Sequence, residues 1–194
     1  RDILMLTLLT LMEVQMKALI VSDNEYRTET FQRLEQLVHT ILSQKGFDIE
    51  EVKIEKDELG YCMGCFGCWI KKPGECVIND KMGSINRSFI NSDAVFYLSP
   101  VVFGQYSCNI KNTLDRWLPN ILPFFITRKD GSTMHPPRYN EYPVQILIGY
   151  GDDLTEDEMN LFSSITRQLN RISIFYQGND NETTAAIEQL ELKR

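Results

Sequence analysis

Short apolar runs typical of buried strands alternate with amphipathic helical patterns along most of this chain. Neighbouring parallel strands need a long crossover between them, usually a helix. The alternation therefore favours a parallel sheet with helices packed on both of its faces, because such strands are buried on both sides. The strands are expected at residues 17–21, 47–54, 94–98, 144–148 and 172–176.

The segments between these strands carry apolar residues at three- and four-residue spacing, as amphipathic helices do. Lys45-Gly46 is expected to end the first helix, Asn79 or Asp80 to cap the second, and Thr155 to Glu158 to form a capping box. Five strands joined by helices predict a three-layer, doubly wound α/β domain with the flavodoxin-like strand order 2-1-3-4-5. The helices are expected at residues 31–42, 82–89, 110–118, 155–169 and 181–192.

The length and charge of the chain limit its organisation and its partners. It has 194 residues, which suits one domain, and 27 acidic against 20 basic side chains give a net charge of −7. Without a cluster of Lys and Arg, this balance argues against nucleic acid or an anionic membrane as a partner. The apolar run at residues 3–12 is too short to cross a bilayer. We expect a disordered leader at residues 1–15, one domain at residues 16–194, and a cytoplasmic location.

One segment interrupts the alternation of strands and helices. Residues 119–143 contain five of the seven prolines and several aromatic residues. A loop of this length inside a compact domain usually has a function of its own. We expect it to be a lid or a subunit contact.

Four of the five cysteines are clustered. Soft thiolates in a Cys-x2-Cys-x2-Cys run match the local wrap of an iron–sulfur cluster, and the Pro73-Gly74 turn could return the fourth cysteine. Zinc sites usually combine two separated pairs of cysteines, and disulfides are rare in a reducing compartment. The alternatives are a 4Fe–4S cluster, a zinc ion and unmetallated thiols, whereas Cys108, at the start of the third helix, is expected to be a packing residue. The candidate metal ligands are Cys62, Cys65, Cys68 and Cys76.

In an open parallel sheet, ligands bind beyond the carboxyl ends of the strands. Three loops are expected there, at residues 22–30, 99–107 and 149–153. The sequence resembles the NADPH-dependent FMN reductases and iron–sulfur flavoproteins of the flavodoxin superfamily from about residue 16 to 176. Two segments carry the resemblance. One is the cysteine run with Pro73-Gly74-Glu75-Cys76 and Asn79-Asp80-Lys81-Met82; the other is Ser99-Pro100-Val101-Val102-Phe103-Gly104 with Lys111, Leu114, Asp115 and Arg116.

This resemblance implies that FMN binds across the three loops, with NAD(P)H as co-substrate. The first loop and the following helix would hold the phosphate, the second would pass beside phosphate and ring, and the third would line the isoalloxazine. Phe103 or Tyr106 could pack against the flavin, and Gly104 would let the backbone approach it. The implied cofactor-binding residues are Ser22, Arg27, Thr28, Thr30, Pro100, Val101, Val102, Phe103, Gly104, Gly149, Tyr150 and Gly151.

The first loop departs from the family pattern, which usually has a Ser-Pro-Arg or a Gly/Ser/Asn-rich phosphate loop. It carries Asp23, Glu25 and Glu29 against the single basic residue Arg27. Glu29 stands where a helix N-terminus attracts an anion, so it could fill the role of the phosphate. The loop is therefore either an FMN site or a degenerate one.

The resemblance implies an FMN-dependent NAD(P)H:acceptor oxidoreductase or an electron-transfer flavoprotein. No catalytic side chain is expected, because the flavin carries the chemistry. The implied partners are a small-molecule electron donor and acceptor, and the family implies a homodimer or homotetramer. The alternative is a non-catalytic flavodoxin-like protein with a degenerate phosphate loop.

Overall fold

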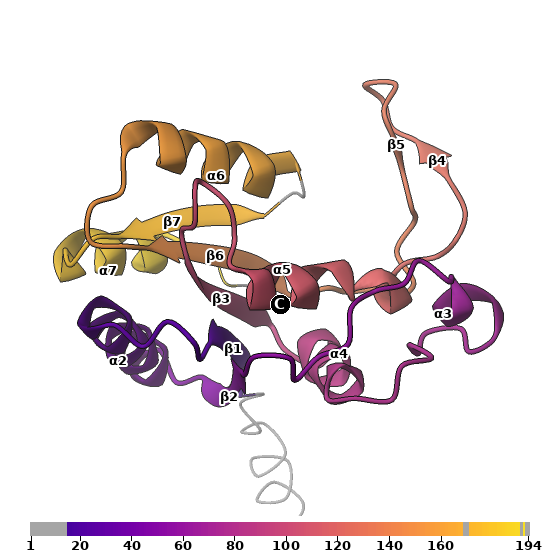
Figure 1. Ribbon diagram of the computed structural model, residues 1–194, viewed down its shortest axis with the longest axis horizontal. Coiled ribbons are helices and arrows are strands. Elements are labelled where there is room, and N and C mark those ends of the chain that lie inside the picture. The colour runs from indigo at the N-terminus through magenta and orange to yellow at the C-terminus, as the bar shows by residue number, and fades with distance from the viewer. Residues whose placement is uncertain (1–14, 169–170, 191, 193–194) are drawn as a thin grey trace, which may run out of the picture.

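The computed structural model contains one five-stranded parallel sheet with the order β2-β1-β3-β6-β7 (Figure 1). Counted within this sheet, the order is 2-1-3-4-5, which confirms the predicted topology. The strands are β1 (Lys17–Asp23), β2 (Asp48–Ile54), β3 (Ala94–Pro100), β6 (Val144–Tyr150) and β7 (Ile172–Tyr176). The structure describes residues 15–168, 171–190 and 192. Residues 1–14 of the expected leader, and Leu169 of the expected fourth helix, lie outside the described residues.

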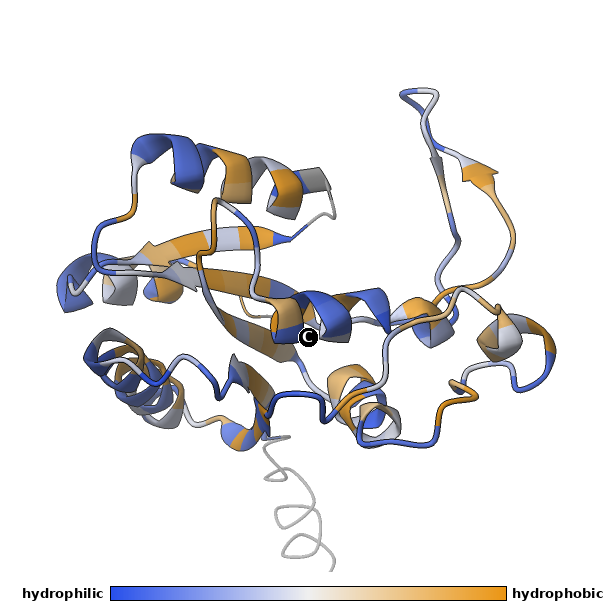
Figure 2. Ribbon diagram, in the orientation of Figure 1, coloured by the Kyte–Doolittle hydropathy of each residue, from blue (hydrophilic) through white to orange (hydrophobic). Residues whose placement is uncertain are grey.

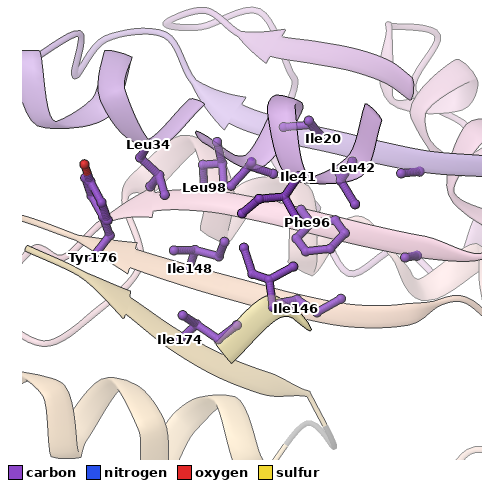
Figure 3. Close-up of a cluster of buried hydrophobic side chains, with 14 of the residues drawn as sticks. Ile20, Leu34, Ile41, Leu42, Phe96, Leu98, Ile146, Ile148, Ile174 and Tyr176 are labelled. Carbon is purple, nitrogen blue, oxygen red and sulfur yellow. The ribbon is translucent and has the colours of Figure 1, made fainter. Parts of the chain in front are cut away.

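Helices cover both faces of the sheet, as predicted. On one face α2 (Glu29–Gln44) and α7 (Asp180–Glu188) enclose an apolar core, which Figure 3 shows with Leu34, Ile41 and Leu42 above Phe96 and Ile148. On the other face α4 (Met82–Ile90), α5 (Cys108–Asp115) and α6 (Glu156–Gln168) enclose a second core. Hydrophobic colour therefore concentrates on the strands and on the inner sides of the helices (Figure 2).

Burial along the strands follows their place in the sheet. All seven residues of central β3 are buried, because helices cover both of its faces. Strand β2 lies at an edge, and only Val52 and Ile54 of its seven residues are buried. This confirms the more exposed second strand that its alternating sequence predicts.

Two predicted helix ends are confirmed, since Lys45 is the C-cap of α2 and Glu158 and Thr155 exchange the two bonds of a capping box. Thr28, which was not predicted as a cap, accepts a hydrogen bond from Phe31 N at 3.1 Å through its Oγ1. The N-cap position of α4 is Lys81, whose side chain makes no cap bond. Of the two predicted residues, Asp80 contacts this end, since its Oδ1 accepts from Met82 N at 3.1 Å.

Two helices end earlier than their apolar spacing predicts. Helix α5 stops at Asp115 with Arg116 as its C-cap, and a 3₁₀ turn, η1 (Leu118–Asn120), follows, in which Pro119 has no N–H to continue the α-helical hydrogen bonds. Helix α7 stops at Glu188. Beyond it Leu190 N donates to Ile187 O, three residues back, which is the 3₁₀ pattern and not the α-helical one. The expected extensions to residues 118 and 192 were therefore wrong.

Besides η1, three short elements were not predicted. Helix α3 (Gly67–Ile70) lies within the cysteine segment, and β4 (Ile126–Thr127) pairs with β5 (Thr133–Met134) in a hairpin within residues 119–143. Figure 1 shows the hairpin and α3 at the same end of the molecule, far from α2 and α7. Their contact is direct, because the Trp69 and His135 rings lie 4.9 Å apart. None of the helices in the described part of the chain has the length and hydrophobicity needed to span a membrane.

Candidate cofactor sites

The three loops expected at the carboxyl edge of the sheet are tied to one another. The Tyr150 hydroxyl donates to Tyr26 O at 3.1 Å, which joins the third loop to the first. The Thr30 hydroxyl donates to Asp152 across the same pair of loops. Asn109, just after the second loop, donates through Nδ2 to Asp23 Oδ1 at 3.0 Å. The predicted convergence of the loops is therefore present.

Asp23 stands at the centre of this edge, at the end of β1, and is fully buried. Its Oδ1 accepts from Glu25 N at 3.0 Å as well as from Asn109. Its Oδ2 has no hydrogen-bond partner among the described residues. A buried carboxylate oxygen without a donor is costly, so this atom is a candidate contact for a ligand with hydroxyl or N–H groups.

The start of α2 combines free donors with acidic side chains. The first N–H groups of a helix have no acceptor within it, and here Thr28 satisfies only that of Phe31. Arg27 is exposed, and its Nε donates to Asn24 Oδ1 at 2.5 Å. However, Glu29 lies in the first turn, and Asp152 accepts the hydroxyl hydrogen of Thr30. An anion would meet backbone donors here together with two carboxylates.

The second loop contains a tight turn. Val102 and Gln105 exchange two backbone hydrogen bonds of 3.0 Å, with Phe103 and Gly104 at positive φ between them. Phe103 is 87% exposed at the tip and free to contact a ligand. Tyr106 instead packs edge-on against a core phenylalanine and shares a hydrogen bond with Thr166 at 2.9 Å. The structure therefore places Tyr106 in the core and not beside a cofactor.

The glycines of the second and third loops serve the packing of the chain itself. A Cβ on Gly104 would lie 2.9 Å from the side chain of Leu161, and one on Gly149 would lie 2.9 Å from Val101. Gly151 is tighter still, with Leu154 at 2.5 Å. Their small size is thus explained without a ligand. The other expected residues of the site, Ser22, Pro100 and Tyr150, are buried at the strand ends, while Val101 and Val102 are half-buried.

The cysteine segment folds back on itself as predicted. Gly74 N donates to Cys68 O at 3.0 Å, so the Pro73-Gly74 turn returns the chain toward α3. Gly67 permits this approach, since a Cβ there would lie 2.5 Å from Val77 Cγ1. As a result one small cavity is lined by all four clustered cysteines, together with apolar side chains and Arg116. Cys108 lies outside this cavity and is exposed, so the expectation that it is a packing residue was wrong.

The cysteines are not arranged around a single ion. No group of three or more His, Cys, Asp or Glu within the described residues has the geometry to hold one metal ion. Cys68 is buried, and this burial, with Cys76 nearby, raises the pKa of its thiol. Cys62 and Cys65 are exposed. The segment thus presents four thiols around one cavity, with its deepest cysteine held as the neutral thiol.

Asp80 and Arg116 join the two ends of the cysteine segment, residues 60–80, through hydrogen bonds. Gly60 N donates to Asp80 Oδ2 at 2.9 Å, and Arg116 donates to Gly60 O at 2.8 Å and to Asp80 Oδ1 at 2.9 Å. Residues on either side of the four cysteines are thereby held together. Both side chains occur in the segments that resemble the family, but nothing in the sequence signals that they pair.

Comparison with protein families identifies the family of this chain. The model described as "NADPH-dependent FMN reductase" matches residues 16–125, more than half of the chain. The chain belongs to the NADPH-dependent FMN reductase family. The part that matches this family contains the first two loops and the cysteine segment, whereas the third loop lies beyond it.

Curated proteins similar in sequence to this chain include iron–sulfur flavoproteins. One from Archaeoglobus fulgidus is 40% identical over 78 residues, which cover 40% of this chain and 34% of the relative. One from Methanocaldococcus jannaschii is 30% identical over 93 residues, covering 48% of this chain and 47% of the relative. The chain thus spans less than half the length of these curated relatives.

Solved structures share the fold at low sequence identity. A putative quinone reductase from Klebsiella pneumoniae has a TM-score of 0.61 at 10% identity, covering 91% of this chain and 85% of that one. An NAD(P)H:quinone oxidoreductase from Methanothermobacter marburgensis also has a TM-score of 0.61, at 12% identity, covering 90% and 93%. These similarities establish the flavodoxin-like fold.

Proposed function

We propose that this protein is an FMN-dependent oxidoreductase that takes electrons from NAD(P)H and passes them to a small-molecule acceptor or to an iron–sulfur centre. Membership of the FMN reductase family supports this proposal. The observation that carries it in the structure is the unpaired Oδ2 of buried Asp23, where the three loops meet beside the start of α2. FMN, when bound, accepts hydride from a reduced nicotinamide and returns electrons to an acceptor.

The residues at this edge fit FMN in the chemistry of their donors and acceptors. Asp23 Oδ2 would accept from a ribityl hydroxyl, which removes the cost of an unpaired buried carboxylate oxygen. The first-turn amides of α2, with the Thr28 hydroxyl and Arg27, would hold the phosphate. Phe103, exposed on its turn, would pack against the ring and exclude water. This chain's own residues thus bind, orient and shield the cofactor, and none needs to carry a proton.

We further propose that Cys62, Cys65, Cys68 and Cys76 bind a 4Fe–4S cluster. Four thiolates on one zinc ion lie within about 4 Å of one another, because each Zn–S bond is about 2.3 Å. In a four-iron cluster each thiolate binds a different iron, so the four sulfur atoms lie farther apart than they do around one zinc ion. The cavity that all four cysteines line supports this proposal. Such a site requires thiols kept reduced, which fits the cytoplasm.

An absorption spectrum of anaerobically purified protein tests both cofactors. We expect the resolved bands of oxidised flavin, and a broad brown absorption with iron and acid-labile sulfide. Protein that is colourless and gives no change in FMN fluorescence on titration would exclude the flavin. Flavin bands without iron or sulfide would remove only the cluster.

The acidic first loop supports a second candidate, a flavodoxin-like protein that binds no FMN. The Thr30 hydroxyl is engaged by Asp152, and Glu29 lies in the first turn of α2, where a phosphate would otherwise bind. The same titration separates the two functions, since this candidate leaves FMN fluorescence unchanged at every protein concentration.

Asp152→Asn is expected to tighten FMN binding about fivefold. The substitution removes one negative charge beside the phosphate position, and a unit charge at about 4 Å is worth about 1 kcal/mol in water. Fluorescence titration at low salt measures the change. The matched control is Asp130→Asn, which removes the same charge from the distant turn of the β4–β5 hairpin and should leave the affinity unchanged. Equal affinities for the wild type and both variants would show that the phosphate lies elsewhere.

We also propose that copies of the chain associate as a homodimer or homotetramer through residues 119–143. Phe124 and Phe125 on this segment are 65% and 70% exposed, which is costly for an isolated copy. Light scattering should give a multiple of 22.5 kDa for the wild type and 22.5 kDa for the variant with both residues changed to Asp. Lys129→Asp, on the same hairpin, should keep the wild-type mass. A wild-type mass of 22.5 kDa would contradict the proposal.

A further inference from the structure

The guanidinium of Arg116 is buried with one of its donors unused. The side chain is 0% exposed. Its two terminal nitrogens donate to Gly60 O and to both carboxylate oxygens of Asp80. Its Nε has no hydrogen-bond partner among the described residues. A buried charged donor without an acceptor is costly, so a native structure is expected to provide an acceptor for it.

The cysteine cavity adjoins the Arg116 side chain and contains sulfur atoms, which are weak hydrogen-bond acceptors. Arg116 lines this cavity together with the four cysteines, and the other lining side chains are apolar apart from the thiols. Cys76 lines the same small cavity as Arg116, so its sulfur is near the guanidinium. Sulfur is therefore the only class of acceptor that the cavity offers among the described side chains.

We propose that Arg116 donates its Nε–H to a sulfur of this cavity and thereby raises the reduction potential of the iron–sulfur cluster, an inference that rests on the proposed cluster. Reduction adds negative charge to the sulfurs, and a hydrogen bond to them stabilises that state. Because Asp80 balances the charge of Arg116, the fixed N–H dipole, rather than net charge, produces the effect. Arg116 is a positioning and tuning residue, since it also joins the two ends of the cysteine segment.

Arg116→Lys separates this hydrogen bond from the charge. A lysine keeps one positive charge beside Asp80 but has no Nε–H at the position of the arginine. In anaerobically reconstituted holoprotein, we expect the ratio of reduced to oxidised cluster at a fixed ambient potential to fall about tenfold, which is a shift of about 59 mV for a one-electron couple. A redox titration followed by electron paramagnetic resonance measures it.

Arg138→Lys is the matched control. Arg138 also lies near the cavity, but its Nε already donates to Pro119 O at 2.8 Å, and Pro119 lines the cavity. This variant should titrate as the wild type does. A second measurement tests the contact directly in the wild-type protein and uses the two variants only to assign it. In wild-type protein with ¹⁵N-labelled arginine, electron–nuclear double resonance of the reduced cluster should show coupling to an arginine nitrogen, which Arg138→Lys retains and Arg116→Lys loses.

The outcomes separate this inference from the proposed function. A cluster that assembles with full iron and sulfide, but shows no arginine coupling and no shift in Arg116→Lys, overturns the role of Arg116 and leaves the cluster standing. Protein that takes up no iron and sulfide overturns the cluster and this inference together. Equal shifts in the two lysine variants would also overturn it, because they would show a general effect of replacing arginine near the cavity.

Discussion

Asp80→Ala is expected to lower the free energy of unfolding by about 3–5 kcal/mol, because it leaves the buried guanidinium of Arg116 without its counter-ion. Arg116 has a side-chain exposure of 0% and donates to both oxygens of Asp80. The same carboxylate accepts from Gly60 N and Met82 N, so its loss also frees two backbone donors. Urea denaturation followed by circular dichroism measures the change.

A second aspartate provides the control for this prediction. Asp115 pairs with Lys111 on the surface of α5, where both side chains are about half exposed. Asp115→Ala should cost no more than about 0.5 kcal/mol, as exposed i,i+4 pairs do. The double variant Asp80→Leu with Arg116→Met should recover most of the loss, since apolar pairs can replace buried ion pairs. A double variant as unstable as Asp80→Ala would show that the backbone bonds, rather than the charge, matter most.

The pH dependence of stability should report the same pair. Burial alone would raise the pKa of Asp80, but the hydrogen bonds from Arg116 and Gly60 lower it overall. A folded pKa below the unfolded one gives stability that is present above the unfolded value, about 3.9, and is lost as pH falls through the folded value. The difference in stability between the wild type and Asp80→Asn should therefore shrink as pH falls below about 4.

The layers of this fold could be predicted because each depends on a local pattern. Strand β3 opens with a run of five buried hydrophobic residues, 94–98, and α2 repeats its apolar residues with the period of a helix. The two-residue strands β4 and β5 and the four-residue helix α3 are shorter than any such period, so they left no pattern to detect. The pairing of Arg116 with Asp80 joins residues thirty-six positions apart, which local spacing cannot contain.

Some features of the candidate site could be predicted from the sequence and others could not. The edge of the sheet and the shared cavity of the cysteines follow from topology and from the Pro73-Gly74 turn, and both could be predicted. The interaction of Thr30 with Asp152 joins residues 122 positions apart, so sequence could show only the acidic character of the loop. Tyr106 illustrates the limit for single residues, because its place in a flavin loop could not reveal that its hydroxyl bonds Thr166 inside the core.

Cys68→Ala is expected to lower the iron and acid-labile sulfide of anaerobically reconstituted protein to about a tenth or less of the wild-type content, since each corner of a cluster needs its thiolate. Cys68 is the buried member of the four, so neither solvent nor a surface side chain can readily replace it. Its raised thiol pKa adds a testable detail. The proton must leave when metal binds, so assembly should become faster as pH rises.

Cys108→Ala provides the control for cluster assembly, because Cys108 is exposed and lies outside the cavity that the other four cysteines line. It should retain the iron and sulfide of the wild type. Thermal unfolding of the apo forms, with transitions close to that of the wild type, would show that Cys68→Ala lost metal and not fold. Equal iron in the two variants would contradict the cluster on this loop. If the wild type instead contains about one zinc per chain and no sulfide, and Cys68→Ala loses the zinc, the same four cysteines bind a structural metal. Such a protein is expected to be colourless and to show no redox transition.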